Sequence, residues 1–275
     1  MRRKRPERCG RLLHRIPIRD YSVKMCSIRL VSATAAVVAA SVFLPIAAFA
    51  QRGFLEGEPK PPTPIPTGPT PRMPDGKPNL SGVWNSPNFG STGGALPLQP
   101  WAQKLADDRR RADGVDDPEA KCLPSGVPRI SPYPMKIVQT PDLIVMLFEG
   151  NVHSYRQFFL GRGHDKTLDP SYFGESIARW DGDTLVVDTV NFNTNTWLNT
   201  AGAPHTDQLH VIERYHRPDL GHIEVEITLE DPGALTKPHT YKRSHTLDVA
   251  WEIHEYVCND FVIDTTRSGD SPAPK

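Results

Sequence analysis

The sequence has no overall excess of charge of either sign. Its 275 residues contain 32 Lys and Arg residues and 32 Asp and Glu residues. The first 50 residues hold ten of the basic and two of the acidic residues, so the rest of the chain has 22 basic and 30 acidic residues, a formal charge of −8. A nucleic-acid interface requires a basic patch. We therefore expect no nucleic acid among the partners of the mature chain.

Short motifs for nucleotide and metal chemistry are also missing. The chain has no phosphate-binding loop, no glycine-rich dinucleotide fingerprint and no zinc-finger spacing. The nearest candidate for a metal site is "HTDQLH", with His205, Asp207 and His210, but its spacing matches none of the usual zinc signatures. The sequence therefore predicts neither a cofactor nor a metal.

Cysteine is scarce. Of four cysteines, Cys9 and Cys26 lie in the first 50 residues, which leaves Cys122 and Cys258 in the rest of the chain. Two cysteines in an exported chain are able to form one disulfide, which here would close a loop of more than a hundred residues. The alternative is two buried free thiols. We predict a Cys122–Cys258 disulfide.

The long apolar run of the sequence lies near the N-terminus. Residues 25–50 combine a basic start, an apolar run and the small-x-small sequence "AFA", which is typical of a secretory signal peptide. An uncleaved membrane anchor is the alternative, because the run approaches the length that spans a bilayer. Residues 1–24 are a basic extension, and translation starting at Met25 would remove them. We predict a signal peptide over residues 1–50, cleavage without stable membrane insertion, and a periplasmic or secreted mature protein.

The mature chain divides by composition. Residues 51–79 hold nine prolines and predict an extended linker. Residues 80–264 predict one folded domain, and residues 265–275 a disordered tail. The oligomeric state stays open.

Residues 100–114 predict the one short helix, with Pro100 at its start and Gly114 as its stop. From residue 136 onward, short runs rich in β-branched and aromatic residues predict strands in series. Such a series predicts a mainly β fold, an antiparallel barrel or a sandwich. The predicted strands cover residues 136–140, 143–149, 153–160, 176–180, 183–189, 208–216, 221–230, 239–247 and 251–258.

Several charged residues share the strand phase of apolar residues. Glu213 alternates with Leu209, Val211 and Tyr215. A charge on a dry sheet face costs several kcal/mol unless it is paired, hydrogen-bonded or hydrated. The pattern thus indicates either a polar cavity inside the fold or buried ion pairs, such as Arg156 with Glu149 or Glu213. The residues read as inward-facing are Glu149, Arg156, Asp188, Glu213 and Glu255.

The cavity interpretation predicts acid–base chemistry. A desolvated glutamate acts as a general base near neutral pH, and a nearby histidine transfers the proton in the opposite sense. We expect Glu213 as the base, His205 or His210 as the acid, and Arg156 as the group that holds an anion. The polar loop 161–170 would close the cavity mouth, unless it is an ordinary surface loop. The expected substrate contacts are Glu149, Trp180, Arg214, Tyr215 and Glu255.

The predicted function is therefore that of a cofactor-independent lyase or isomerase, which acts on a small, partly apolar organic molecule. A periplasmic binding or carrier protein without turnover is the first alternative, since the same cavity would then bind without reaction. An envelope interaction domain without a small-molecule site is the second.

Four segments, "LSGVW", "CLPSGVPR", "GDTLVVDT" and "PHTDQLHVIER", resemble a family of exported β-rich proteins common in soil bacteria. The resemblance covers most of residues 80–258 and implies no particular activity. One departure is "GRGHDK" at 161–166, where the family has "DGRxHP". Gly82 and Trp84 also resemble the Gly-x-Trp that opens lipocalin-like (calycin) barrels, which implies a barrel rather than a sandwich. The family pattern includes Arg156, Trp180, Asp183, His205, His210, Glu213 and Arg214.

Overall fold

The computed structural model describes residues 63–86, 91–129, 134–150 and 154–258. These residues belong to one compact unit, Lys60–Lys275. The predicted signal peptide, residues 51–62 of the predicted linker and the predicted tail lie outside the described residues. No helix within the described ranges is long and apolar enough to cross a membrane.

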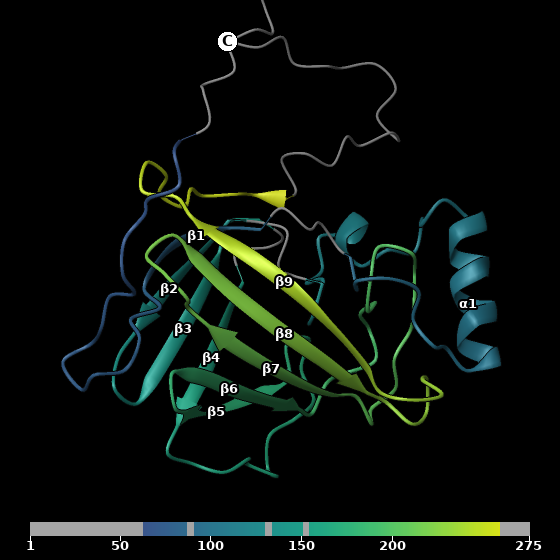
Figure 1. Ribbon diagram of the computed structural model, residues 1–275. Helices are drawn as coiled ribbons and strands as arrows, with labels where there is room; N and C mark the ends of the chain where they lie inside the picture. Colours follow the sequence, from purple (N-terminus) through teal and green to yellow (C-terminus); the bar gives the residue numbers. More distant parts are fainter. Residues whose placement is uncertain (1–62, 87–90, 130–133, 151–153, 259–275) are drawn as a thin grey trace, which may run out of the picture. The chain divides into compact units, whose positions relative to one another are not determined.

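Within these ranges, nine strands in chain order form one closed barrel, in which the last strand pairs with the first (Figure 1). The closed barrel confirms the predicted mainly β fold and selects the barrel over the sandwich. The strands are β1 (Gly82–Asn85), β2 (Met135–Gln139), β3 (Leu143–Phe148), β4 (Tyr155–Leu160), β5 (Glu175–Asp181), β6 (Thr184–Val190), β7 (His210–His216), β8 (His222–Glu230) and β9 (His239–Leu247).

Alternating side chains fill the barrel. In β8, Ile223, Val225, Ile227 and Leu229 are all buried, as the sequence pattern predicts, and the residues between them lie on the outer face. Facing strands supply residues in the same phase, and these side chains form a single hydrophobic core. The interior is therefore a packed core.

Trp84 of β1 is fully buried in this core. Its indole Nε1 donates to the carbonyl of Leu80 at 3.0 Å, and the Arg217 guanidinium lies over its ring at 4.8 Å. The hydrogen bond satisfies the polar edge of a large buried ring. Trp84 thus anchors the first strand at the position where the Gly-x-Trp resemblance implied a barrel opening.

The predicted helix is α1 (Pro100–Arg111), which lies outside the barrel (Figure 1). Pro100 is suited to the first turn because that position needs no amide donor. Ala102 and Ala106, four residues apart, form its buried side, and the chain leaves the helix through Asp113 and Gly114 at positive φ. A short 3₁₀ helix, η2 (Glu119–Lys121), follows.

One predicted strand is wrong. Residues 251–258 form no strand and run outside the barrel, because β9 pairs with β1 and the closed barrel leaves no edge for a further strand. Side-chain contacts hold the segment instead: Trp251 Nε1 donates to Glu149 at 2.7 Å, and Lys136 Nζ donates to Glu252 at 2.6 Å. The predicted Cys122–Cys258 disulfide is confirmed, with an S–S distance of 2.07 Å.

The pairing of β4 with β5 is parallel, whereas the other neighbouring strands pair in antiparallel fashion. Parallel strands require a crossover, because the end of one lies far from the start of the next. Residues 161–174 make this connection, and Phe173 within them packs against the barrel core. We call them the crossover segment.

Candidate functional site

A buried ion pair lies inside the barrel. Arg156 of β4 and Glu213 of β7 form two hydrogen bonds, of 3.1 and 2.6 Å, and both side chains are almost inaccessible to solvent. The Arg156 guanidinium also lies 3.4 Å from Ser176 Oγ and 3.3 Å from Thr189 Oγ1. The prediction that both charges face inward is confirmed, and their pairing matches the ion-pair alternative.

Tyr215 completes the environment of Glu213. Its hydroxyl donates to Glu213 Oε1 at 2.9 Å. Burial and the neighbouring carboxylate raise the pKa of Tyr215 well above its ordinary value. Burial lowers the pKa of Arg156, but the carboxylate outweighs this, so that pKa is raised overall. Arg156 is therefore a permanent cation, and both oxygens of Glu213 accept hydrogen bonds from neighbouring side chains.

The two predicted histidine partners lie elsewhere. His205 is buried in the loop before β7, where Nε2 contacts Thr196 Oγ1 at 2.7 Å and Nδ1 contacts Thr206 O at 2.9 Å. Burial lowers its pKa. His210 opens β7 three residues before Glu213 and so points to the outer face. Both histidines are among the described residues, and neither contacts Glu213.

Two predicted interior carboxylates are outside the barrel. The buried residues of β3 are Ile144, Met146 and Phe148, which places Glu149 in the outer phase. Glu255 is exposed and belongs to no strand. The predicted inward orientation is therefore wrong for both. For Glu149 the reason is physical: "LIVMLF" is apolar on both faces, so its alternation does not reveal which face is inside.

The remaining predicted residues divide between the two faces. Tyr215 faces the interior, and Trp180 packs partly buried against the core. Arg214 lies on the outer face, where its guanidinium donates to Asp181 at 2.9 Å. Asp188 also lies outside, because β6 buries Leu185, Val187 and Thr189 in the other phase, so its predicted inward orientation is wrong.

The interior leaves little free space. A cavity of about 20 Å³ remains, enough for one water molecule. His245 lines this cavity. Burial and the nearby Arg243 lower the pKa of His245 to about 3, so this imidazole is neutral at neutral pH. Sites for drug-sized molecules have several hundred Å³. The lining includes Arg156, Glu213, Tyr215, Arg243 and His245.

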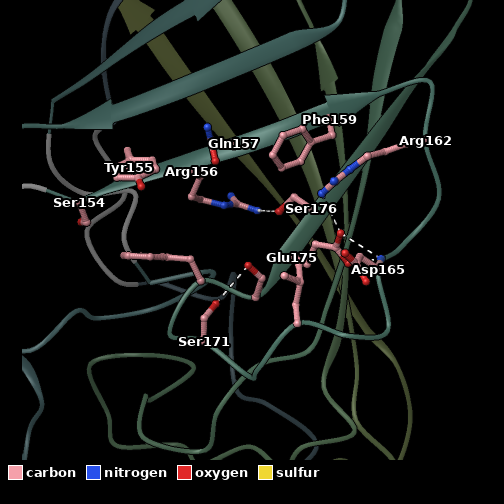
Figure 2. A pocket seen from close by; sticks show the side chains of 13 residues that line it. Ser154, Tyr155, Arg156, Gln157, Phe159, Arg162, Asp165, Ser171, Glu175 and Ser176 are labelled. Carbon is pink, nitrogen blue, oxygen red and sulfur yellow. Dashed lines mark hydrogen bonds and ion pairs between the residues drawn. The ribbon is translucent and has the colours of Figure 1, made fainter.

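A larger groove of about 600 Å³ lies between β4 and the crossover segment (Figure 2). Strands β4 and β5 pair over three residues each, Phe158–Leu160 with Ser176–Ala178. Tyr155, Gln157 and Phe159 line the groove from β4, and their side chains belong to the outer phase of that strand. The residues from the other wall are Arg162, Asp165, Leu168, Ser171, Phe173, Gly174 and Glu175.

The groove extends through the wall of the barrel. Arg156 and Ser176 belong to the inner phase of their strands, yet both line the groove, and Arg156 also lines the interior cavity. Figure 2 shows the Arg156 guanidinium directed at Ser176. At the other end, the Arg162 guanidinium lies 3.7 Å from the centre of the Phe159 ring and donates to Glu175 at 2.8 Å. The groove thus combines aromatic surface with two guanidinium groups.

Sequence reasoning did not identify Phe159, Phe173 or Glu175 as site residues. The available signal was the polar loop at 161–170, interpreted as a cover for a cavity mouth, which now forms part of the groove wall. Across the described ranges, no group of three or more His, Cys, Asp or Glu side chains is arranged to hold a metal ion.

The geometry defines a closed β-barrel with a groove beside β4. Two similar solved structures are the crystal structures of the fluorescent protein UnaG, as wild type and as a mutant, at 16% and 14% sequence identity. Each match covers 62% of this chain and 97% or 96% of the other chain, with a TM-score of 0.31. No protein-family model matches the chain, and no curated protein matches it. The resemblance to exported soil-bacterial proteins therefore stays a prediction.

Proposed function

We propose that the protein is an exported binding protein for a small, partly apolar organic molecule, which it holds in the groove beside β4. The observation that carries this proposal is the contrast between the two spaces. The groove of about 600 Å³ is within the usual range for small-molecule sites, whereas the interior cavity of about 20 Å³ is far below it.

The lining favours a planar ligand with an anionic or polar edge. Tyr155, Phe159 and Phe173 offer ring faces and edges for stacking. Arg162 already lies over Phe159, so a planar ligand would extend that stack. The guanidinium of Arg162, whose side chain is 40% exposed, suits a carboxylate or a carbonyl oxygen at the ligand edge.

Binding without turnover accounts for Glu213 better than catalysis does. A general base needs a free lone pair directed at the substrate. In this structure both Glu213 oxygens accept hydrogen bonds, from Arg156 and Tyr215, and the two candidate histidines are bonded to other groups. The lyase or isomerase function, with Glu213 as the base and a histidine as the acid, stays the second candidate, and the same experiment tests it.

The test is incubation of the purified protein with a bacterial metabolite extract. Native mass spectrometry then identifies retained compounds, and analysis of the extract detects conversion. We expect a retained, chemically unchanged compound, whose affinity falls at least about tenfold in Phe159→Ala because a stacking face is lost. Val138→Ala, at an exposed position on the outer face of β2 that does not line the groove, is the control and should bind normally.

Two results would contradict the proposal. Equal retention by Phe159→Ala and the wild type would place the ligand outside the groove. Conversion of the compound by the wild type would establish catalysis, and its loss in a Glu213→Gln variant that still retains the compound would return Glu213 to the role of base.

A further inference from the structure

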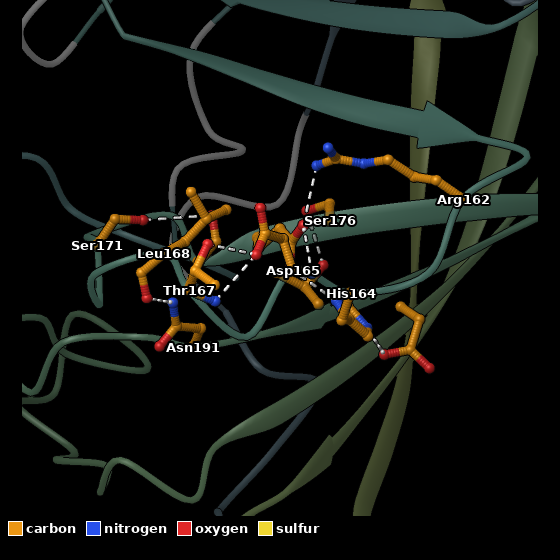
Figure 3. A network of polar contacts seen from close by, with 12 residues as sticks. Arg162, His164, Asp165, Thr167, Leu168, Ser171, Ser176 and Asn191 are labelled. Carbon is orange, nitrogen blue, oxygen red and sulfur yellow. Dashed lines mark hydrogen bonds and ion pairs between the residues drawn. The ribbon is translucent and has the colours of Figure 1, made fainter.

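A row of alternating carboxylates and imidazoles crosses the outer wall beside the groove. His164 of the crossover segment lies between Glu175 and Asp188, with Nδ1 3.1 Å from Glu175 Oε2 and Nε2 3.1 Å from Asp188 Oδ1. His210 of β7 continues the row, with Nε2 2.9 Å from the same Asp188 oxygen and Nδ1 3.1 Å from Glu230 Oε2. Figure 3 shows His164 within this network.

The number of protons determines whether these four contacts are favourable. A carboxylate accepts hydrogen bonds, and a neutral imidazole donates from only one of its nitrogens. Each histidine here faces a carboxylate oxygen with both nitrogens. All four contacts are therefore hydrogen bonds only when His164 and His210 are both protonated.

The charges balance in the same protonation state. The charged groups that these contacts place around the two histidines are Glu175 on β5, Asp188 on β6, Glu230 on β8 and Arg162 on the crossover segment. Asp165, beside His164, instead accepts hydrogen bonds from Thr167. Two imidazolium ions and one guanidinium neutralise three carboxylates. Neutral histidines would leave a net charge of −2 and two carboxylate oxygens facing imidazole lone pairs.

The row fastens the crossover segment to the barrel. Glu175 accepts hydrogen bonds from the Arg162 side chain and from the Asp165 backbone N–H, besides its contact with His164. Apolar contacts anchor the end of the segment next to β5, where Phe173 packs against the core and stacks on Phe148, whereas Leu168 is 45% exposed. A stretch held by partly exposed polar contacts opens more readily than a packed strand. The attachment of residues 161–168 therefore depends on the charges around Glu175 and Asp188 and on the Asn191 side chain, which donates to Leu168 O at 2.9 Å.

We propose that His164 and His210 form a pH-dependent clasp that keeps the crossover segment against β5 and β6. While both are protonated, residues 161–168 complete the groove wall through Arg162, Asp165 and Leu168. Once both are neutral, each keeps only one of its two hydrogen bonds and turns a lone pair toward the other carboxylate, and residues 161–168 are released. The effect on ligand affinity rests on the proposed function, whereas the release itself does not.

The primary test is backbone amide exchange of the purified protein at pH 5.5 and 8.5, corrected for the intrinsic dependence of exchange on pH. We expect protection of the Asp165 amide, which donates to Glu175, to fall at least about tenfold at the higher pH, an opening change of the size usual for coupled sites. The Leu247 amide, which donates to Gly221 O at 2.8 Å, is the internal control and should show no such change.

Three variants assign the effect. His164→Gln and Asp188→Asn should give low Asp165 protection at both pH values, because neither keeps the protonated contact. His216→Gln, at the exposed opposite end of β7, should behave as the wild type. Asp165 protection that is equal at both pH values in the wild type would overturn the clasp, as would a pH response that persists in His164→Gln.

The ligand gives a separate readout. A compound that binds in the groove should lose affinity about tenfold between the two pH values in the wild type and not in His164→Gln. If amide exchange responds to pH but no compound binds the groove, the clasp stands and the proposed function fails. If a compound binds the groove and exchange does not respond, the clasp fails and the proposed function stands.

Discussion

Arg156 and Glu213 place opposite charges in a packed interior, and each is stable there because of the other. Removal of a buried ion from water costs several kcal/mol, which a bidentate pair with further hydrogen bonds offsets. Ser176, Thr189 and Tyr215 supply those further bonds. The fold therefore requires both charges together, and Arg156 also borders the groove.

We expect Glu213→Gln to lower the free energy of unfolding by about 3–5 kcal/mol, because it leaves Arg156 as an uncompensated buried cation. Arg214→Gln is a close control. Its exposed pair with Asp181 lies on the outer face of the barrel and should contribute little to stability, because solvent screens both charges. Urea unfolding measures both. Similar losses in the two variants would mean that the Arg156–Glu213 pair is hydrated.

The double variant Arg156→Met with Glu213→Leu tests whether the ion pair as a whole stabilises the fold. Both charges disappear together, so we expect most of the stability lost in Glu213→Gln to return. A double variant at least as unstable as the single one would instead show that the polar network of Ser176, Thr189 and Tyr215 requires the ions.

His245 makes stability depend on pH. Its pKa is about 3 in the folded chain and near 6.5 when unfolded, so between these values the unfolded chain binds the extra proton and stability falls as pH falls. Between pH 7 and pH 5 this loss is about 2 kcal/mol. His245→Gln should lack it, whereas His216→Gln should keep it. Urea unfolding at both pH values measures the loss of stability in each variant. Because the clasp contributes equally to both variants, its contribution cancels in the difference between their losses.

The sequence allowed residue orientations to be predicted only where polar and apolar residues alternate. The pattern of β7 placed Glu213 inside correctly because the polar residues His210 and Arg214 mark the opposite phase. The pattern of β3 did not, because every residue in it is apolar. The inward orientation predicted for Asp188 was wrong for a related reason. Val186 on the outer face is itself buried, so "TLVVDTV" gives no clear inner phase.

At the scale of elements, the local sequence pattern predicted the helix and eight of the strands that form the barrel. It did not predict the direction in which neighbouring strands pair. Parallel pairing of β4 with β5 depends on where the crossover segment returns, which is a contact between residues distant in sequence. The groove, its guanidinium groups and the clasp all follow from this crossover. The candidate site was therefore predicted only in its Arg156 and Glu213 part.

The disulfide attaches a segment without strand structure to the barrel domain. Cys122 and Cys258 are separated by 136 residues, and closing so long a loop restricts the unfolded chain strongly. We expect the double variant Cys122→Ser with Cys258→Ser to lower the free energy of unfolding by about 2–5 kcal/mol. Guanidinium unfolding of the wild type with and without reductant should give a similar loss. An unfolding midpoint that does not respond to reductant would contradict this contribution.

For the molecule as a whole, the hydrophobic core and the proposed binding groove occupy different parts of the barrel. The packed interior supplies the hydrophobic core, while the groove lies where the wall is incomplete, beside a segment held by charge. A protein built in this way can alter its binding surface without opening its core. Composition and strand pattern predicted the fold class, but the position of the site depends on the one parallel pairing.

The predicted export of the protein concerns the whole chain, because it depends on the N-terminal signal peptide. Signal peptidase requires small residues three positions and one position before the cleaved bond, which Ala48 and Ala50 supply. We therefore expect intact-mass analysis of the protein expressed in an exporting bacterium to show a mature chain that begins at Gln51. Ala50→Leu should block processing, whereas Phe49→Ala, at the tolerant position between the two, should not. A full-length wild-type chain in the membrane fraction would support the uncleaved anchor, and the groove would then act on ligands at a membrane surface rather than in free solution.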